Sequence, residues 1–427
     1  MTREESNRSS NPPERGPDSL SLAQRAVLGS CAILVVLTVV VRPLVLKSGP
    51  SGDFMTIFRQ TERFWSGDVP YGGANPYLPS TYAVMAYQAP LAPRTAWLVW
   101  RIVGMALVAA LAFAVYPLLS RNLGKWWGGL ALANILLLSG ISPWSGNPGN
   151  LAGVGSVLGY SVLAAGNPLL GGAILGVACS LKYSIGLPFL LLALVSRQWR
   201  FALAGVAVFA IANGIGVSYA WLHGTSPVDV VQSLFGGVAR VGGYEQSGFQ
   251  EWFSGTDPHR FQLMNLLPLL NSFGIDRITA NAICMVALGV GLVTALFCAV
   301  WRRPPFLAAA AVFSPFFLLC TYHRFYDSAI ITFPLLLAWL NQSEESRVYR
   351  WGVILASCTL FLSFSNTLQT RAPAGLIAFD SWWWNYLVGP HHVYALALLA
   401  VAITVVAVRY TKVRQFGDNS DAGEQWP

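Results

Sequence analysis

About a dozen strongly apolar segments recur along the chain, and this recurrence limits the folds that the sequence can adopt. Hydrophobic residues make up 54% of the 427 residues and charged residues 11%, with a mean hydropathy of +0.52. Charged residues form about 25% of an ordinary soluble domain. The segments run for about 15 to 25 residues, which suits helices and not the short alternating strands of a barrel. The sequence therefore predicts an all-α polytopic membrane protein.

The apolar segments predict a bundle of about 10–12 transmembrane helices with both termini in the cytoplasm. The expected spans are residues 26–46, 96–119, 126–142, 151–165, 168–181, 184–196, 201–222, 278–301, 306–320, 327–341, 351–368 and 391–408. Basic groups, which favour the cytoplasmic side, fall on the side of the N-terminus if the spans number twelve. These groups begin at Arg121, Arg197, Arg302, Arg347 and Arg409. The two short runs around Lys182 could instead form a re-entrant pair, and both versions leave Lys182 facing outside.

The remaining segments divide the chain into a membrane domain and two tails. Residues 1–25 are polar and are expected to form a disordered cytoplasmic tail, residues 26–410 the transmembrane domain, and residues 411–427 a second cytoplasmic tail. Residues 52–82 and 223–277 are expected to be outer loops. The run FGGVARVGGY in the second loop predicts flexibility, because no strand precedes it as a phosphate-binding fingerprint would require.

Asp53 opens the loop that is most suggestive of a reaction site. The residues after it alternate apolar and polar faces with helical spacing, from Phe54 to Trp65, which predicts an amphipathic helix along the outer face of the membrane. Glycines, prolines and tyrosines then end the regular structure. An acid beside an interfacial helix could serve as a reacting carboxylate. The alternative is that Asp53 only caps a helix that begins at Phe54.

Lys182 is a lone cation between two apolar runs, where a charge is costly unless it meets a partner or a cavity. It could bind the phosphate of a substrate, or its side chain could extend to the outer interface. A second polar group, residues 322–327, joins two other apolar runs and contains His323, Arg324, Tyr326 and Asp327. Such a concentration of polar side chains at membrane depth favours a functional site, and an Arg fork suits a phosphate. An ion pair between Arg324 and Asp327 is the structural alternative.

Other classes of site and partner are not indicated. The five histidines show no HxxxH or HExxH spacing and no DxD pair occurs, so neither a metal site nor another cofactor is predicted. The net charge of +8 comes from basic residues scattered over loops, which positive-inside topology explains better than nucleic-acid binding.

These residues together resemble the polyprenol-phosphate-sugar-dependent membrane glycosyltransferases of the GT-C fold, specifically glycosyltransferase family 87. The likeness runs through an Asp-Phe pair, a Gly-x-x-Pro-Tyr element with a following Tyr-x-Pro, a Gly-x-x-Asn-like element, a Leu-Lys element and an outer-face histidine. In this chain they are Asp53-Phe54, Gly67 to Tyr71, Tyr77-Leu78-Pro79, Gly146 to Asn150, Leu181-Lys182 and His323. Asn147 stands where the family has Gln, and Tyr183 where it has Pro.

The resemblance implies that Asp53 is the catalytic base and that Lys182, His323 and Arg324 surround the donor phosphate. Tyr77, Asn150, Tyr326 and Asp327 are further candidates for binding the substrate. The implied function is inverting transfer of a mannose- or arabinofuranose-like sugar from a polyprenyl-phosphate donor to a lipid-linked or cell-envelope glycan. The reaction would take place on the extracytoplasmic face of the plasma membrane.

A transporter or lipid flippase is the rival hypothesis, since polar residues at membrane depth also mark substrate pathways. The sequence shows no paired broken helices in two matching halves, and the candidate residues gather on one face. Both features favour the enzyme.

Overall fold

The computed structural model describes residues 20–41, 49–71, 77–139, 146–241, 264–302, 304–321, 325–341, 343–361 and 381–409, with the backbone alone at 237–241, 325–326 and 361. Every regular element within these ranges is helical, which confirms the predicted all-α class. Both predicted tails lie almost wholly outside the described residues.

Five helical segments within the described ranges are long and apolar enough to cross a membrane. They are α1 with the π-helix η1 (Leu22–Val36 and Leu37–Val41), α5 (Pro93–Ser139), α9 (Trp199–Leu222), α13 (Arg277–Trp301) and the π-helix η6 with α18 (Trp384–Val388 and His391–Arg409). The expected spans 96–119 and 126–142 correspond to the two halves of α5. The helix is interrupted between them at Gly124, whose φ of 75° few residues other than glycine adopt.

Shorter apolar helices complete the bundle. They are α6 (Pro148–Ala164), α7 (Pro168–Leu181), α8 (Tyr183–Val195), α14 (Pro305–Cys320), the 3-10 helix η4 (Phe325–Ile331) continuing into α15 (Thr332–Leu340), and α16 (Arg347–Phe361). These elements fall where spans were expected, which confirms a polytopic membrane protein. The count of twelve crossings stays a prediction.

The remaining helices lie at the ends of the bundle: α3 (Gly52–Trp65), α4 (Pro79–Val84), α10 (Pro227–Val241), α12 (Leu267–Ser272) and the short 3-10 helices η2 (Ala86–Gln88) and η5 (Glu344–Ser346). The expectation that the run FGGVARVGGY is flexible is wrong for its first part, because α10 continues through Gly236 and Gly237 to Val241. Most residues of this helix, its valines among them, are weak helix formers, so we attribute the helix to its apolar face, which buries Val230, rather than to propensity.

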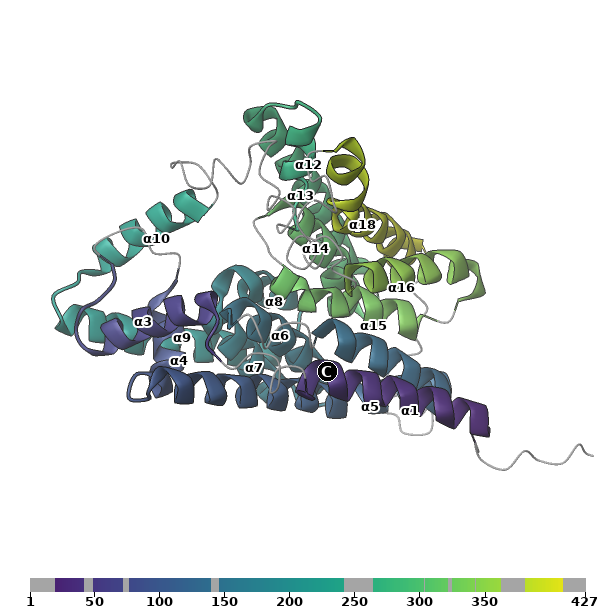
Figure 1. Ribbon diagram of the computed structural model, residues 1–427, viewed down its shortest axis with the longest axis horizontal. Helices are drawn as coiled ribbons and strands as arrows, with labels where there is room; N and C mark the ends of the chain where they lie inside the picture. Colours follow the sequence, from purple (N-terminus) through teal and green to yellow (C-terminus); the bar gives the residue numbers. More distant parts are fainter. Residues whose placement is uncertain are drawn as a thin grey trace, which may run out of the picture.

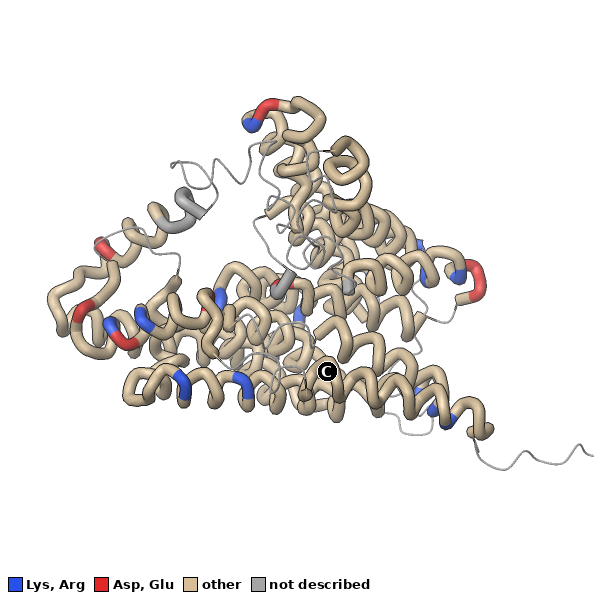
Figure 2. The backbone as a smooth tube through the Cα atoms, viewed as in Figure 1, with Lys and Arg blue, Asp and Glu red and all other residues tan. Residues whose placement is uncertain are grey.

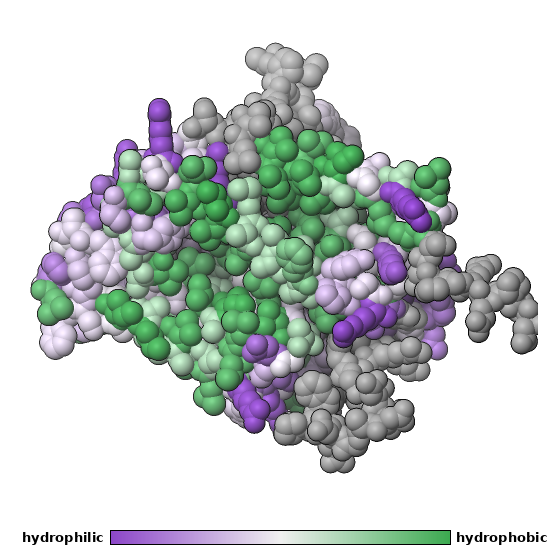
Figure 3. Space-filling view, turned by 90° about the horizontal axis from the view of Figure 1, so that it is seen from below, coloured by the Kyte–Doolittle hydropathy of each residue, from purple (hydrophilic) through white to green (hydrophobic). Residues whose placement is uncertain are grey.

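The helices form two groups that meet in the middle of the molecule (Figure 1). The first contains α3 to α9, with α1 lying along α5, and the second contains α12 to α18. Contacts of η4 with α6 and of α15 with α5 join them. Charged residues lie mostly at helix ends and on α3 (Figure 2), and the face in Figure 3 carries a broad hydrophobic area bordered by hydrophilic patches. This distribution fits a molecule surrounded by lipid.

Glycines allow the helices of the first group to pack closely. A Cβ placed on Gly159 would lie 2.7 Å from the Gly171 carbonyl oxygen, and one on Gly176 would lie 2.5 Å from that of Gly205. Small residues at such crossings let backbones approach each other where apolar burial contributes little, as in lipid. The close contact of α6, α7 and α9 fixes the helix ends that carry the candidate site.

Candidate functional site

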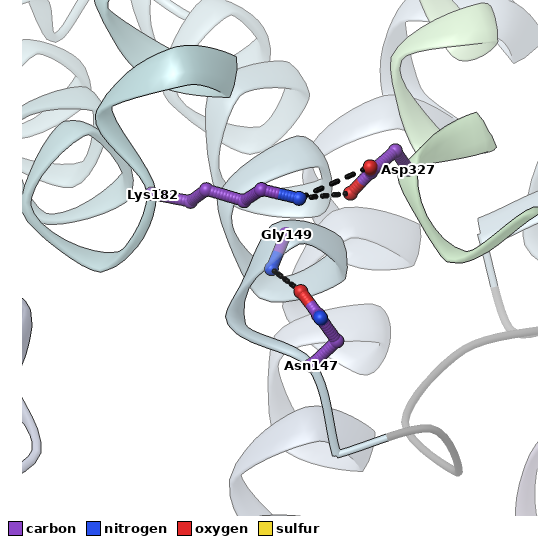
Figure 4. A network of polar contacts seen from close by, with 4 residues as sticks. All are labelled: Asn147, Gly149, Lys182 and Asp327. Atoms are coloured by element: carbon purple, nitrogen blue, oxygen red, sulfur yellow. Dashed lines mark hydrogen bonds and ion pairs between the residues drawn. The ribbon is translucent and has the colours of Figure 1, made fainter. Parts of the chain in front are cut away.

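A partly buried ion pair joins the two groups of helices (Figure 4). Lys182 Nζ donates to both carboxylate oxygens of Asp327, at 3.0 Å to Oδ1 and 3.1 Å to Oδ2. The Lys182 side chain is 18% exposed and that of Asp327 1%. The lysine therefore does not extend to an interface, and the carboxylate that it requires comes from a residue 145 positions away.

Lys182 occupies the tip of a helical hairpin. Its backbone is extended (φ −152°, ψ 96°), so α7 ends at Leu181 and α8 begins at Tyr183. Helix α8 then folds back on α7, since a Cβ on Gly186 would lie 2.6 Å from the backbone nitrogen and Cα of Cys179. The expected pair of short runs around Lys182 is thus a closely packed hairpin that directs the ammonium toward η4.

Helix α4 holds the end of α7 in place. The Thr81 hydroxyl donates to the carbonyl oxygen of Ser180 at 3.0 Å, and the Ser80 hydroxyl donates to the same oxygen at 3.3 Å. These contacts satisfy a carbonyl that the end of a helix leaves without a partner in the helix. The backbone before Lys182 is therefore held by the segment that contains the site candidate Tyr77. The Tyr77 carbonyl oxygen itself accepts a hydrogen bond from the Tyr71 hydroxyl at 3.0 Å.

The first turn of α6 lies against the ion pair. Asn147 caps this helix, because its side-chain oxygen accepts a hydrogen bond from the Gly149 backbone N–H at 2.9 Å (Figure 4). A Cβ on Gly149 would lie 2.7 Å from Lys182 Nζ and would overlap Asp327 Oδ1. The helix N-terminus, with its partial positive charge, thus reaches the Asp327 carboxylate closely because position 149 has no side chain.

Asp53 lies in the first turn of α3 and does not cap it. The N-cap is Ser51, whose hydroxyl accepts a hydrogen bond from the Phe54 backbone N–H at 3.2 Å, and the helix begins at Gly52. The interpretation that Asp53 caps a helix beginning at Phe54 is therefore wrong. Asp53 is partly exposed, and a carboxylate at this position interacts favourably with the helix dipole.

Helix α3 rests on the turn that precedes α6. The Phe54 ring lies 4.8 Å from that of Trp97, and Gly146, with φ 68°, is in such close contact with both residues that a Cβ would overlap Phe54. Phe54, Ile57, Phe58 and Phe64 are buried, which confirms the predicted apolar face. A continuous chain of contacts thus runs from the Asp53 turn through Gly146 to Gly149 and the ion pair.

Sequence reasoning missed two polar residues near this chain of contacts, Arg101 and Ser328. Arg101 of α5 is 6% exposed, and its guanidinium carbon lies 4.6 Å from the centre of the Trp97 ring. A charge inside the apolar run 96–119 was the available signal. Asn150 and Ser328 are each 1% exposed. Asn150 was a candidate, whereas an isolated serine in an apolar run gives no sequence signal.

The other candidates are incompletely described. His323 and Arg324 lie outside the described residues, and Tyr326 is described by its backbone alone. Within the described part of the chain, no three His, Cys, Asp or Glu side chains group as a metal site would require. The described structure thus brings together Lys182, Asp327 and the first turn of α6. The helical turn that contains Asp53 contacts Gly146, which precedes α6.

Residues 52–82 also carry an exposed carboxylate at Asp68. Arg63 Nε donates to Asp68 Oδ2 at 2.7 Å, and this hydrogen bond holds the pKa of Asp68 below its ordinary value. Both side chains are more than half exposed. Asp68 therefore provides a paired carboxylate of the same loop with which Asp53 can be compared.

Comparison with known proteins gives one family. The model of glycosyltransferase family 87 matches residues 75–321, more than half of the chain. The match contains Tyr77, Asn150 and Lys182, whereas Asp53 precedes it and Asp327 follows it. No curated protein matches the chain.

Proposed function

Because the chain belongs to glycosyltransferase family 87 and is a membrane glycosyltransferase, we propose that its donor is a polyprenyl-phosphate sugar and that Asp53 is the base. The transferred sugar is mannose- or arabinofuranose-like, and the acceptor is a lipid-linked or cell-envelope glycan. We place the reaction on the extracytoplasmic face of the plasma membrane. The observation that best supports this proposal is the contact of Phe54 with Gly146, which brings the Asp53 turn next to the turn before α6, whose Gly149 contacts the partly buried Lys182.

The reaction in this proposal needs one carboxylate and several cations. Asp53 accepts the proton of the acceptor hydroxyl, whose oxygen attacks the anomeric carbon from the face opposite the phosphate. The bond from that carbon to the phosphate oxygen breaks, and polyprenyl phosphate leaves with the electron pair. The configuration at the anomeric carbon inverts. A general base of this kind contributes about 10²- to 10⁴-fold in rate.

The leaving phosphate is a stable anion, so it needs no general acid. Lys182, His323 and Arg324 offset the charge that develops on it, and such donors act most strongly where water is excluded. Tyr77, Asn150, Tyr326 and Asp327 are proposed to hold the substrates in position. Burial of Asp327 against Lys182 supports its assignment to this site, because an ionised carboxylate in a bundle interior is costly without a role or a partner.

The test is donor consumption by the purified full-length protein, incubated with polyprenyl-phosphate mannose or arabinofuranose and a membrane extract. The Asp53→Asn variant should lose about 10²-fold or more in turnover, because an amide cannot accept the proton. Its stability should be nearly unchanged, since Ser51 and not Asp53 caps α3.

Asp68→Asn is the matched control, because it removes an exposed carboxylate of the same loop that is paired with Arg63. It should keep wild-type turnover. Full activity of Asp53→Asn would remove the base assignment. A wild-type protein that moves the donor across the membrane without consuming it would support the flippase hypothesis instead.

A further inference from the structure

Three buried polar atoms near the ion pair lack a hydrogen bond. Within the described structure, neither the amide nitrogen nor the amide oxygen of Asn150 has a partner, and the Ser328 hydroxyl also has none. Both residues are 1% exposed. More than nine in ten buried polar groups in folded proteins find a partner, so three such atoms on two helices that contact each other require an explanation.

Several other buried serines of this bundle show the usual arrangement, although the described structure gives the Ser196 hydroxyl no partner either. Ser156 of α6 donates to the Ala152 carbonyl oxygen at 2.8 Å, and Ser314 of α14 donates in the same way to that of Ala310. Such bonds to the preceding turn are the ordinary solution for a serine in an apolar helix. Ser328 departs from this pattern, and it does so immediately after Asp327.

Asn150 and Ser328 are each the next residue in the chain after a residue of the ion-pair contact. Asn150 follows Gly149, which contacts Lys182 and Asp327, and Ser328 follows Asp327 itself. One turn farther along, a Cβ on Gly153 would lie 3.0 Å from the Ala329 Cβ, so η4 and α6 stay in contact beyond the ion pair. The unsatisfied groups are therefore held by the two elements that enclose the pair.

We propose that Asn150 and Ser328 recognise hydroxyl groups of the sugar carried by the donor, beside the Lys182–Asp327 pair. This inference rests on the proposed function and extends it to recognition of the donor sugar. An amide offers donors and an acceptor, and a hydroxyl offers both, which suits neutral groups that donate and accept. A phosphate group only accepts hydrogen bonds, so it could not satisfy the Asn150 side-chain oxygen.

The test compares two ligands on four proteins. Binding of polyprenyl-phosphate mannose and of polyprenyl phosphate without a sugar is measured for the wild type, Asn150→Leu, Ser328→Ala and the control Ser156→Ala. Each site variant should bind the mannose-bearing donor about 2- to 10-fold more weakly, as expected for one lost hydrogen bond, and should bind polyprenyl phosphate as the wild type does. Ser156→Ala should leave both affinities unchanged.

Thermal stability separates recognition from a structural role. Because the described part of the chain gives these groups no partner, replacing them with apolar groups should keep or raise the melting temperature of the ligand-free protein. A lower melting temperature together with unchanged binding of both ligands would show that buried water satisfies these groups, and would overturn the inference. A wild-type protein that binds polyprenyl phosphate equally well with and without mannose would also overturn it. A wild type that binds neither ligand would overturn the proposed function, and the inference with it.

Discussion

Gly149 decides at the scale of one residue whether the centre of the site can form. Its hydrogen occupies the space in which any side chain would meet the Lys182 ammonium and the Asp327 carboxylate. The position lies in a helix with ordinary backbone angles, so glycine is required there by close approach and not by conformation. Its helix propensity is poor, which means that packing decides the residue.

Replacing Gly149 with alanine should therefore force the ion pair apart. We expect the free energy of unfolding to fall by about 1–3 kcal/mol, the usual cost of overpacking, and donor turnover to fall with it. Denaturation of the purified protein in detergent measures the first quantity and donor consumption the second.

Gly214→Ala is the control, because this glycine of α9 has no atom within 4 Å of a Cβ position. It should be neutral or stabilising, by about 0.5–1 kcal/mol. Equal stability of the Gly149→Ala variant and this control would show that the ion pair adjusts without cost.

Single residues were also the hardest feature to predict from the sequence. That Lys182 needs an anion follows from its apolar surroundings, but the choice of Asp327 depends on how α6, α7 and η4 pack, which no local pattern contains. The alternative partner of Asp327 that the sequence offers, Arg324 at helical spacing, lies outside the described residues. The Asn150 candidate could be found from a short motif, and Ser328 could not.

At the scale of elements, α4 shows how a six-residue helix positions a functional side chain far away in the sequence. Its hydroxyls at Ser80 and Thr81 bind the last carbonyl groups of α7, immediately before the residue that carries the ammonium. The hairpin tip therefore depends on a loop element almost a hundred residues earlier in the chain.

Thr81→Val should loosen this attachment while keeping the shape of the side chain. We expect a loss of about 1 kcal/mol in the free energy of unfolding for one hydrogen bond. The specificity constant kcat/KM for the donor should fall by about 10-fold, because small displacements of a binding group reduce turnover. Thr81→Ser keeps the hydroxyl and should restore activity. Wild-type kcat/KM in the valine variant would show that Ser80 alone is sufficient.

Elements with a strong period were predicted well and their ends less well. The apolar face of α3 was correct because four buried residues repeat at helical spacing, whereas its start was wrong by two residues because Ser51 competes with Asp53 as a cap. The glycines of α10 suggested a loop, yet they lie in a helix that buries Val230 on its apolar face. Tertiary contacts and the identity of the cap decide such details.

At the scale of the molecule, the two groups of helices surround a site whose parts come from distant segments. The class of the protein follows from apolar length alone, since only helices satisfy their backbone in lipid over such segments. The number of crossings does not, because α7, α8 and α15 are too short for length to show whether each one spans the membrane.

Cysteine labelling tests the orientation. In a variant without the native cysteines, Asp68→Cys should react with an impermeant maleimide on intact cells, because the basic groups place the first loop outside. Glu344→Cys, beside the basic group that begins at Arg347, should react only after the membrane is opened. Both original side chains are well exposed, so access is not limiting. Labelling of both positions from the same side would exclude the predicted topology.

The separation of Lys182 from Asp327 also has a consequence for biosynthesis. Ribosomes add about 5–20 residues per second, so the 145 residues from Lys182 to Asp327 take roughly 7–30 s to make. During that time the newly inserted hairpin exists without its carboxylate, and an ammonium left in lipid is costly. The nascent chain must therefore keep Lys182 in water or at the lipid headgroups. The burial of Lys182 is a late step of assembly, because Asp327 of η4 must be synthesised first.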